Sequence, residues 1–209
     1  MTPERRQFVL RRLHSLSGIV PIGVYLVFHI MLANASVLGG PAAFDRTAAS
    51  IGALPGPTLL AIEVLFVYLP LLFHGLYGFV RLADADLAGS PRQDWIGGYL
   101  YTLQRITGVI AFFFIGWHVY TTRMQYYFAG AEIGYQFMRG LMTSPVAFPI
   151  FVVGTLASVF HFTNGIWTFC ITWGLTPGVH AQRAVRAISL VGCAAMSATA
   201  LAIFMAFRA

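Results

Sequence analysis

Four histidines lie in long apolar stretches of the sequence, one in each stretch: His29, His74, His118 and His161. An ionisable side chain is costly at membrane depth and is usually functional there. One such residue alone would more readily be a core histidine that is hydrogen-bonded to a neighbour. Four of them, one per stretch, favour a role as metal ligands.

The stretches around these histidines have the length and composition of membrane spans. Hydrophobic residues make up 58% of the 209 residues and charged residues only 10%, too few charges to cover the surface of a soluble domain. A span needs about 20 predominantly apolar residues. We therefore predict an all-α integral membrane protein with five transmembrane helices in a single membrane domain over residues 1–209. The predicted spans are residues 15–36, 57–80, 99–122, 146–172 and 184–207.

Segments with turn residues separate these spans, and we predict loops at residues 39–57, 83–94, 130–144 and 174–183. Helices I to IV, which carry the histidines, are expected to form the ligand-binding bundle. The fifth span has no histidine and is rich in Ala, Ser and Gly, so we assign it to helix packing.

The net charge of +6 comes from thirteen arginines that are scattered between apolar runs, a pattern of membrane anchoring and not of nucleic-acid binding. Nine of them fall on one predicted side: Arg5, Arg6, Arg11, Arg12, Arg81, Arg92, Arg105, Arg183 and Arg186. Four fall on the other: Arg46, Arg123, Arg139 and Arg208. The bias predicts a cytoplasmic N-terminus and a C-terminus outside.

The depth of each histidine in its span predicts how the four pair. His118 comes five residues before Arg123, which is about 8 Å along a helix. His74 comes seven residues before Arg81, about 10 Å from the opposite boundary. Since helices I and III run outward and helices II and IV run inward, His29 and His118 share an outer level, and His74 shares an inner level with His161. The sequence therefore predicts two bis-histidine sites stacked across the membrane.

Two axial nitrogens per site match haem iron, so we predict two haems b. A structural zinc site needs four ligands in one coordination sphere, and a di-iron site needs several glutamates in the bundle, where only Glu63 lies. One alternative is another di-haem cytochrome b, but the bc type places two ligands on one helix about 13 to 14 residues apart. Here the ligands are 45, 44 and 43 residues apart. The other alternative is a small proton-coupled transporter, whose histidines would relay protons and bind no haem.

The sequence contains a faint internal repeat. Helices II and IV both read Phe-His-x-x-x-Gly, ending at Gly78 and Gly165, while helices I and III both place a hydroxyl residue before a glycine, Gly18 or Gly108. We expect Gly18 and Gly154 to admit the edge of a porphyrin, and close helix packing is the alternative reason for small residues there.

Residues 11–18 (RRLHSLSG), 68–78 (YLPLLFHGLYG) and 103–108 (LQRITG) resemble the cytochrome b membrane anchor of succinate:quinone oxidoreductases, and the single-chain, five-helix, di-haem type most of all. The resemblance implies a bacterial cytoplasmic-membrane complex with a flavoprotein and an iron–sulfur subunit on the cytoplasmic face. This chain would pass electrons between the iron–sulfur subunit and a membrane quinone, menaquinone sooner than ubiquinone, and would do no chemistry on succinate itself. The resemblance also assigns His74 and His161 to the haem nearer the iron–sulfur subunit.

Further candidate residues lie at both boundaries. Glu63 is eleven residues before His74, so we expect it on the bundle-facing side at the outer level, where it could exchange protons with a quinone. The alternative is a neutral, hydrogen-bonded buried acid. Some fumarate reductases of this type carry a glutamate two residues before the fourth histidine, where Val159 stands here. A cluster at the inner boundary is expected to contact haem propionates or the headgroup interface: Arg11, Arg12, His14, Ser15, Gln104, Arg105 and Arg183.

Overall fold

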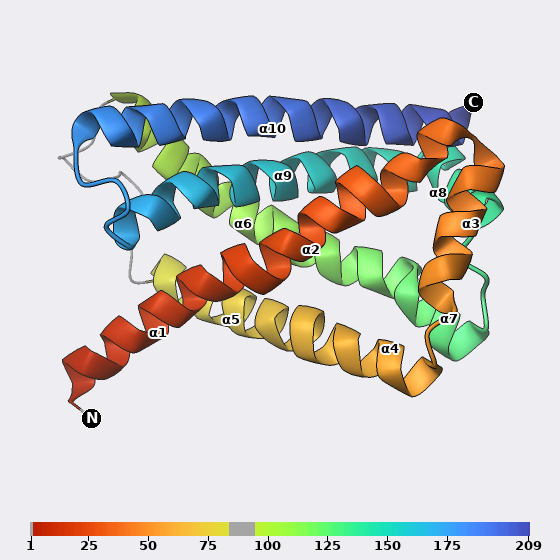
Figure 1. Cartoon of the computed structure of the whole chain (residues 1–209), viewed down its shortest axis with the longest axis horizontal. Coiled ribbons are helices and arrows are strands. Elements are labelled where there is room, and N and C mark those ends of the chain that lie inside the picture. The colour runs from red at the N-terminus through yellow and green to blue at the C-terminus, as the bar shows by residue number, and fades with distance from the viewer. Residues whose placement is uncertain (1, 84–94) are drawn as a thin grey trace.

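The computed structural model describes residues 2–83 and 95–209, and no β-strand occurs in them (Figure 1). Among the described residues, five helices are long and apolar enough to cross a membrane, so the predicted number of spans and the all-helical class are confirmed. We call them the first to fifth spans: Pro3–Gly39, Gly56–Ala83, Gly97–Ala129, Ala147–Thr172 and Val179–Arg208. Arg92 and most of the predicted second loop lie outside the described residues.

The surface of the bundle is apolar where lipid would surround it. Val24, Leu65, Phe113, Val153 and Val191 are each more than half exposed, and each belongs to a different span. Large apolar side chains exposed on every helix of a bundle are typical of a membrane protein, because lipid rather than water is their solvent.

The helices extend beyond the predicted apolar stretches. The first begins at Pro3, twelve residues before the predicted start at residue 15, with the Thr2 side chain as its N-cap. Hydropathy detects only the part of a helix that lipid would surround, whereas backbone hydrogen bonds continue into the arginine-rich turns. The first span is built from α1 (Pro3–Ser17), a π-helical segment (Gly18–Gly23), α2 (Val24–Val27), a second π-helical segment (Phe28–Ala33) and a 3-10 segment (Asn34–Gly39).

Prolines and π-helical segments occur together in the first two spans. Pro21 lacks a backbone N–H and lies within the first π-helical segment, and His29 lies within the second. In the second span, Pro70 follows the π-helical segment Val64–Tyr68, which joins α4 (Gly56–Glu63) to α5 (Leu69–Ala83). Such segments are frequent at functional sites, because they rotate the side chains that follow them relative to a regular helix.

The remaining spans are more regular. The third consists of α6 (Trp95–Thr121) and α7 (Arg123–Ala129), the fourth is α9 (Ala147–Thr172), and the fifth is α10 (Val179–Arg208). As predicted, α10 serves packing: its buried side chains Met196, Ala200, Ile203 and Phe204 belong to the hydrophobic core.

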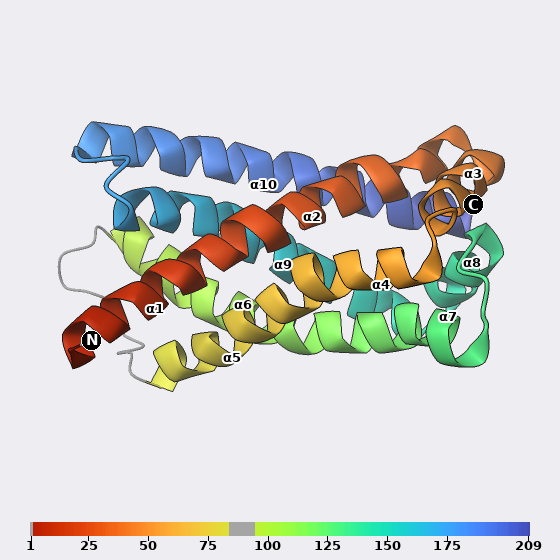
Figure 2. The ribbon, with the colours of Figure 1, turned by 60° about the horizontal axis from the view of Figure 1, so that its bottom comes forward.

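Two of the predicted loops contain helices, which is a correction to the sequence analysis. They are α3 (Pro41–Gly52) and α8 (Tyr135–Thr143), which lie with α7 at the end of the bundle that holds the C-terminus, opposite the N-terminus (Figures 1 and 2). The backbone N–H of Tyr135 donates to Asp45 Oδ1 at 2.7 Å, which ties α8 to α3. Glycine and proline at the ends of these segments predicted the turns correctly. The helices between the turns are amphipathic and too short to resemble a membrane span, so the sequence analysis did not predict them.

Candidate functional site

The four span histidines meet in two pairs. The ring centroids of His29 and His118 are 5.8 Å apart, and those of His74 and His161 are 6.0 Å apart. We call His29 and His118 the outer pair and His74 and His161 the inner pair. The pairing in space is the one that depth in the spans predicted.

The spacing of each pair suits one metal ion between two imidazoles. With metal–nitrogen bonds of about 2 Å each, the two ring centres would lie about 6 Å apart. The rings are steeply inclined, at 67° in the outer pair and 83° in the inner pair. Within the described residues, no group of three or more His, Cys, Asp or Glu side chains is placed to hold a metal ion. A two-ligand site such as the axial positions of haem fits this donor set.

Both inner histidines are oriented by main-chain carbonyls. Nδ1 of His74 lies 2.9 Å from the carbonyl oxygen of His14, and Nδ1 of His161 lies 2.9 Å from that of Gln104. A carbonyl oxygen only accepts, so both Nδ1 atoms carry the proton and donate it. This leaves Nε2 of each ring as the atom that can bind a metal, an arrangement typical of metal-binding histidines.

Glycines make room for the inner rings. A Cβ atom at Gly18 would overlap the ring of His74, and one at Gly108 would lie 2.8 Å from Cε1 of His161. A Cβ at Gly78 would meet Nε2 of His14 at 3.4 Å, and one at Gly165 would meet Nε2 of Gln104 at 3.5 Å. These four glycines are the ones that the sequence repeat contains.

The repeat therefore has a structural reason. Each half of the inner site consists of two helices, and the glycine of each helix faces a polar side chain of the other. The two backbones can therefore approach closely. Gly18, which we expected at a porphyrin edge, faces the His74 ring, and Gly154 faces the ring of Phe114.

The outer pair is oriented differently. The Tyr25 hydroxyl lies 3.5 Å from Nδ1 of His29, and the two rings are stacked with centroids 5.4 Å apart. His118 packs against Phe114 and Phe151, with ring centroids 5.8 and 5.4 Å away. In the described part of the chain, the buried Nδ1 of His118 has no hydrogen-bond partner. A buried polar atom without a partner is rare and points to a functional position.

Glu63 forms an ion pair that the sequence analysis missed. Its Oε1 lies 2.6 Å from a guanidinium nitrogen of Arg123, which the sequence analysis counts only among the outer arginines. The hydroxyl of Tyr127 donates to Oε2 at 2.9 Å, and that of Tyr68 lies 3.4 Å away. Neither interpretation of Glu63 in the sequence analysis includes an ion pair, whereas its carboxylate has a guanidinium partner and two neighbouring hydroxyls. Charges at membrane depth usually pair, and that rule was the signal that could have found Arg123.

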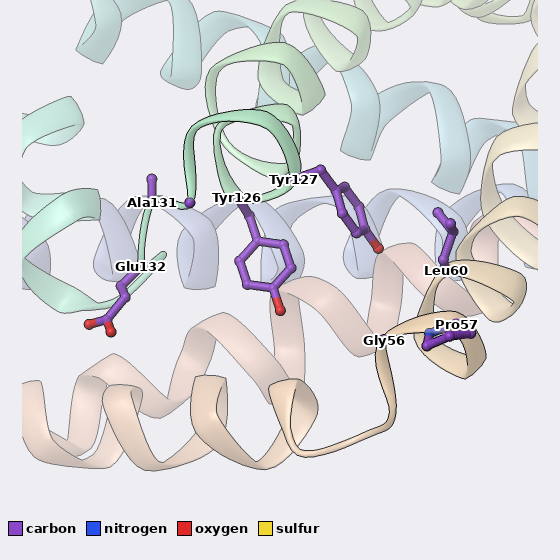
Figure 3. A pocket seen from close by; sticks show the side chains of 8 residues that line it. Gly56, Pro57, Leu60, Tyr126, Tyr127, Ala131 and Glu132 are labelled. Atoms are coloured by element: carbon purple, nitrogen blue, oxygen red, sulfur yellow. The ribbon is translucent and has the colours of Figure 1, made fainter.

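A cavity of about 580 Å³ lies between α4 and α7 and shares Tyr127 with the surroundings of this ion pair. Figure 3 shows Tyr126 and Tyr127 of α7 facing Pro57 and Leu60 of α4 across it. Tyr127 links the cavity to the ion pair, since it lines the cavity and its hydroxyl donates to Glu63. The cavity is lined by Gly56, Pro57, Leu60, Tyr126, Tyr127, Gly130, Ala131 and Glu132.

The amino-acid sequence of the chain is similar to that of known proteins. Residues 88–204 match the family of succinate dehydrogenase/fumarate reductase transmembrane subunits. The chain is also 35% identical over 202 residues to the succinate dehydrogenase cytochrome b558 subunit of Bacillus subtilis (strain 168), with 97% of this chain and 98% of the relative covered. The chain belongs to this family. It is the membrane-anchor subunit of a succinate dehydrogenase or fumarate reductase, as the resemblance implied.

The expected propionate residues of this anchor subunit fall into separate groups. Arg12 and Ser15 both contact Trp173: the guanidinium lies 4.7 Å from the ring centroid, and Trp173 Nε1 donates to Ser15 Oγ at 3.2 Å. Arg105 lies over the ring of Tyr101 at 3.8 Å and contacts its hydroxyl. Arg11 lines a second cavity, of about 390 Å³, and Arg183 is exposed on α10.

The other two members of that set, His14 and Gln104, lie against the inner histidines. At the position where some relatives carry a glutamate, Val159 of the anchor subunit is fully buried. Its side chain has no group that could carry a proton.

Proposed function

We propose that this anchor subunit binds two haems b, one between His29 and His118 and one between His74 and His161, and passes electrons between an iron–sulfur subunit and a membrane quinone. The observation that carries the proposal is the occurrence of two histidine pairs at two depths, each drawn from two different spans. The name of the Bacillus subtilis relative, a cytochrome b558, supports haem b.

Haem b bound at these pairs would supply reversible one-electron transfer. The chain's own residues supply the ligands and fix their tautomers, with Nδ1 of both inner histidines donating to carbonyls. Phe114 and Phe151 pack against His118 of the outer pair.

The arginine bias supports an orientation with the N-terminus in the cytoplasm, as in a bacterial cytoplasmic membrane, and the C-terminus outside. The inner pair would then face the soluble flavoprotein and iron–sulfur subunits. Electrons that pass between the inner and outer sides would cross the membrane potential. The free energy of that transfer would change by about 2.3 kcal/mol per elementary charge for each 100 mV.

The same proposal places quinone, menaquinone sooner than ubiquinone, in the cavity beside Glu63. The cavity is bordered by Tyr126 and Tyr127, and Tyr127 connects it to the carboxylate at 2.9 Å. Reduction of a quinone to the quinol takes up two electrons and two protons, and oxidation of the quinol releases them. Oxygen Oε2 of Glu63, hydrogen-bonded to Tyr127, is the atom that would hold and pass on a proton there.

A reduced-minus-oxidised spectrum with a pyridine haemochrome count tests the proposal. We expect two haems b per chain in the purified complex. Protein from a haem-competent host that contains no haem would contradict it, and the chain would then be a haem-free membrane anchor.

Replacing Glu63 with glutamine is expected to lower quinone-linked turnover about a hundredfold, because positioned proton transfer contributes at least about that factor. The haem count should stay at two, and electron transfer from succinate to a water-soluble acceptor that bypasses the quinone should be unchanged. Glu4→Gln is the matched control, since Glu4 is exposed at the start of α1. Full quinone-linked turnover in Glu63→Gln would remove Glu63 from the proposed proton path.

A further inference from the structure

His14 packs face to face on a ligand of the inner pair. The ring centroids of His14 and His74 are 4.2 Å apart, with only 6° between the planes. The ring of Tyr77, one turn after His74 on the same helix, contacts His14 with a centroid distance of 5.5 Å. The carbonyl oxygen of His14 also accepts the Nδ1 proton of His74. One residue of α1 therefore holds the His74 ring both by stacking and by a hydrogen bond.

Gln104 has the equivalent place in the second half of the repeat. Its carbonyl oxygen accepts from Nδ1 of His161, and its side-chain Nε2 donates back to the carbonyl oxygen of His161 at 2.9 Å. Its Oε1 accepts from Nδ2 of Asn164, which is buried, at 2.8 Å. Both polar ends of the Gln104 side chain are therefore engaged by the helix that carries the ligand.

The close approach of the helices needs Gly18 and Gly108, because a Cβ at either position would overlap the ring of His74 or His161. His14 and Gln104 lie at ordinary contact distance from Gly78 and Gly165, each four residues after the histidine ligand. Rotation of either ligand ring would break its hydrogen bond to the carbonyl, and rotation of His74 would also break the stack. The 83° between the two ligand planes is thus fixed from two sides.

We propose that His14 and Gln104 are positioning residues that set the ring planes of His74 and His161, and that they do not serve as partners of haem propionates. The inference rests on the proposed function in that the inner pair must bind haem. It goes beyond that function by assigning the two residues that decide the geometry of the inner site.

The test uses the whole complex and a spectroscopic signal. The electron paramagnetic resonance spectrum of a ferric haem with two histidine ligands depends on the angle between the two imidazole planes. The midpoint potential of the haem depends on hydrogen bonds to those ligands. We expect His14→Leu and Gln104→Met to change the signal and the midpoint potential of the inner haem alone. The main-chain carbonyl is present in every His14 variant, but only His14→Phe keeps a flat ring that can stack on His74, so it should retain the wild-type signal. The outer haem of the same molecules is the internal control.

Each outcome decides the matter. Loss of the inner haem in His14→Leu and its retention in His14→Phe would also support the stack. An unchanged inner haem in His14→Leu and Gln104→Met would overturn the proposal, and so would equal shifts in His14→Leu and His14→Phe, which would show that the polar ring acts on a carboxylate instead. If His14→Leu does not assemble, His14→Gln serves for the comparison with His14→Phe. Absence of haem from the wild-type complex would overturn the proposed function itself, a result that the variants cannot mimic.

Discussion

Replacing His161 with leucine is expected to lower the haem content from two per chain to one, with the outer haem's spectrum unchanged. The reason is that Nε2 of His161 would be one of only two protein ligands of the inner haem, and its partner His74 lies on another span. A single histidine binds haem iron far less firmly than a pair. Quinone-linked turnover should be abolished, because electrons could no longer enter from the inner side. A pyridine haemochrome count and a redox titration measure both effects.

The pairing can be tested by combining variants. His74→Leu, His161→Leu and the double variant of both should all lose the same one haem, since they damage one site. The combination of His74→Leu with His118→Leu should lose both haems, since these residues belong to different pairs. His180→Leu is the matched control, because His180 is exposed at the start of α10. Loss of two haems from the His74/His161 double variant, with one lost from each single variant, would contradict the assignment.

A single added methyl group at Gly108 is expected to remove the inner haem as well. In Gly108→Ala the Cβ would lie 2.8 Å from Cε1 and 3.0 Å from Nδ1 of His161, which is closer than packed atoms come. The His161 ring cannot move aside without losing its bond to the Gln104 carbonyl, and Gln104 Nε2 holds the main chain of His161 in turn. The overlap must therefore be relieved by separating α6 from α9 or by turning the ligand. Gly18→Ala should act in the same way through His74.

The control for this prediction is Gly116→Ala on the same helix, where the added Cβ would meet no neighbouring side chain or helix within 4 Å. Alanine favours a helix over glycine by up to about 1 kcal/mol at either position, so helix propensity alone would stabilise both variants. Absorbance spectra of the two purified proteins compare them directly. Two haems in Gly108→Ala, with unshifted potentials, would show that the close approach at Gly108 is not required for the inner site.

Much of the fold could be predicted from local sequence. Composition alone predicts each span. The short helices α3 and α8 were not predicted, because they lie in segments where turn residues indicate loops. The helix that contains the first predicted span begins earlier, at Pro3, since its arginine-rich start is helical but not apolar.

The candidate site could be predicted only in part from the sequence. Depth along the spans gave the two histidine pairs, but it grouped His14 and Gln104 with the arginines of the inner boundary. Depth also does not show that the guanidinium of Arg123 pairs with Glu63. Two residues at one depth can face each other or face lipid, and sequence spacing does not distinguish these cases once π-helical segments interrupt the helical period.

The sequence by itself determined the five spans and the two levels of histidines, because burial in lipid needs a run of apolar residues and a helix rises by a constant step per residue. The tertiary structure alone decided which carbonyl oxygens accept the hydrogen bonds from Nδ1 of His74 and His161. It also decided which charged side chain pairs with Glu63 and where the cavity lined by Tyr127 lies. Those contacts depend on how each helix is rotated about its axis and how closely its glycines let the next one approach. Rotation and approach are properties of helix pairs, and they are fixed only when the whole bundle packs.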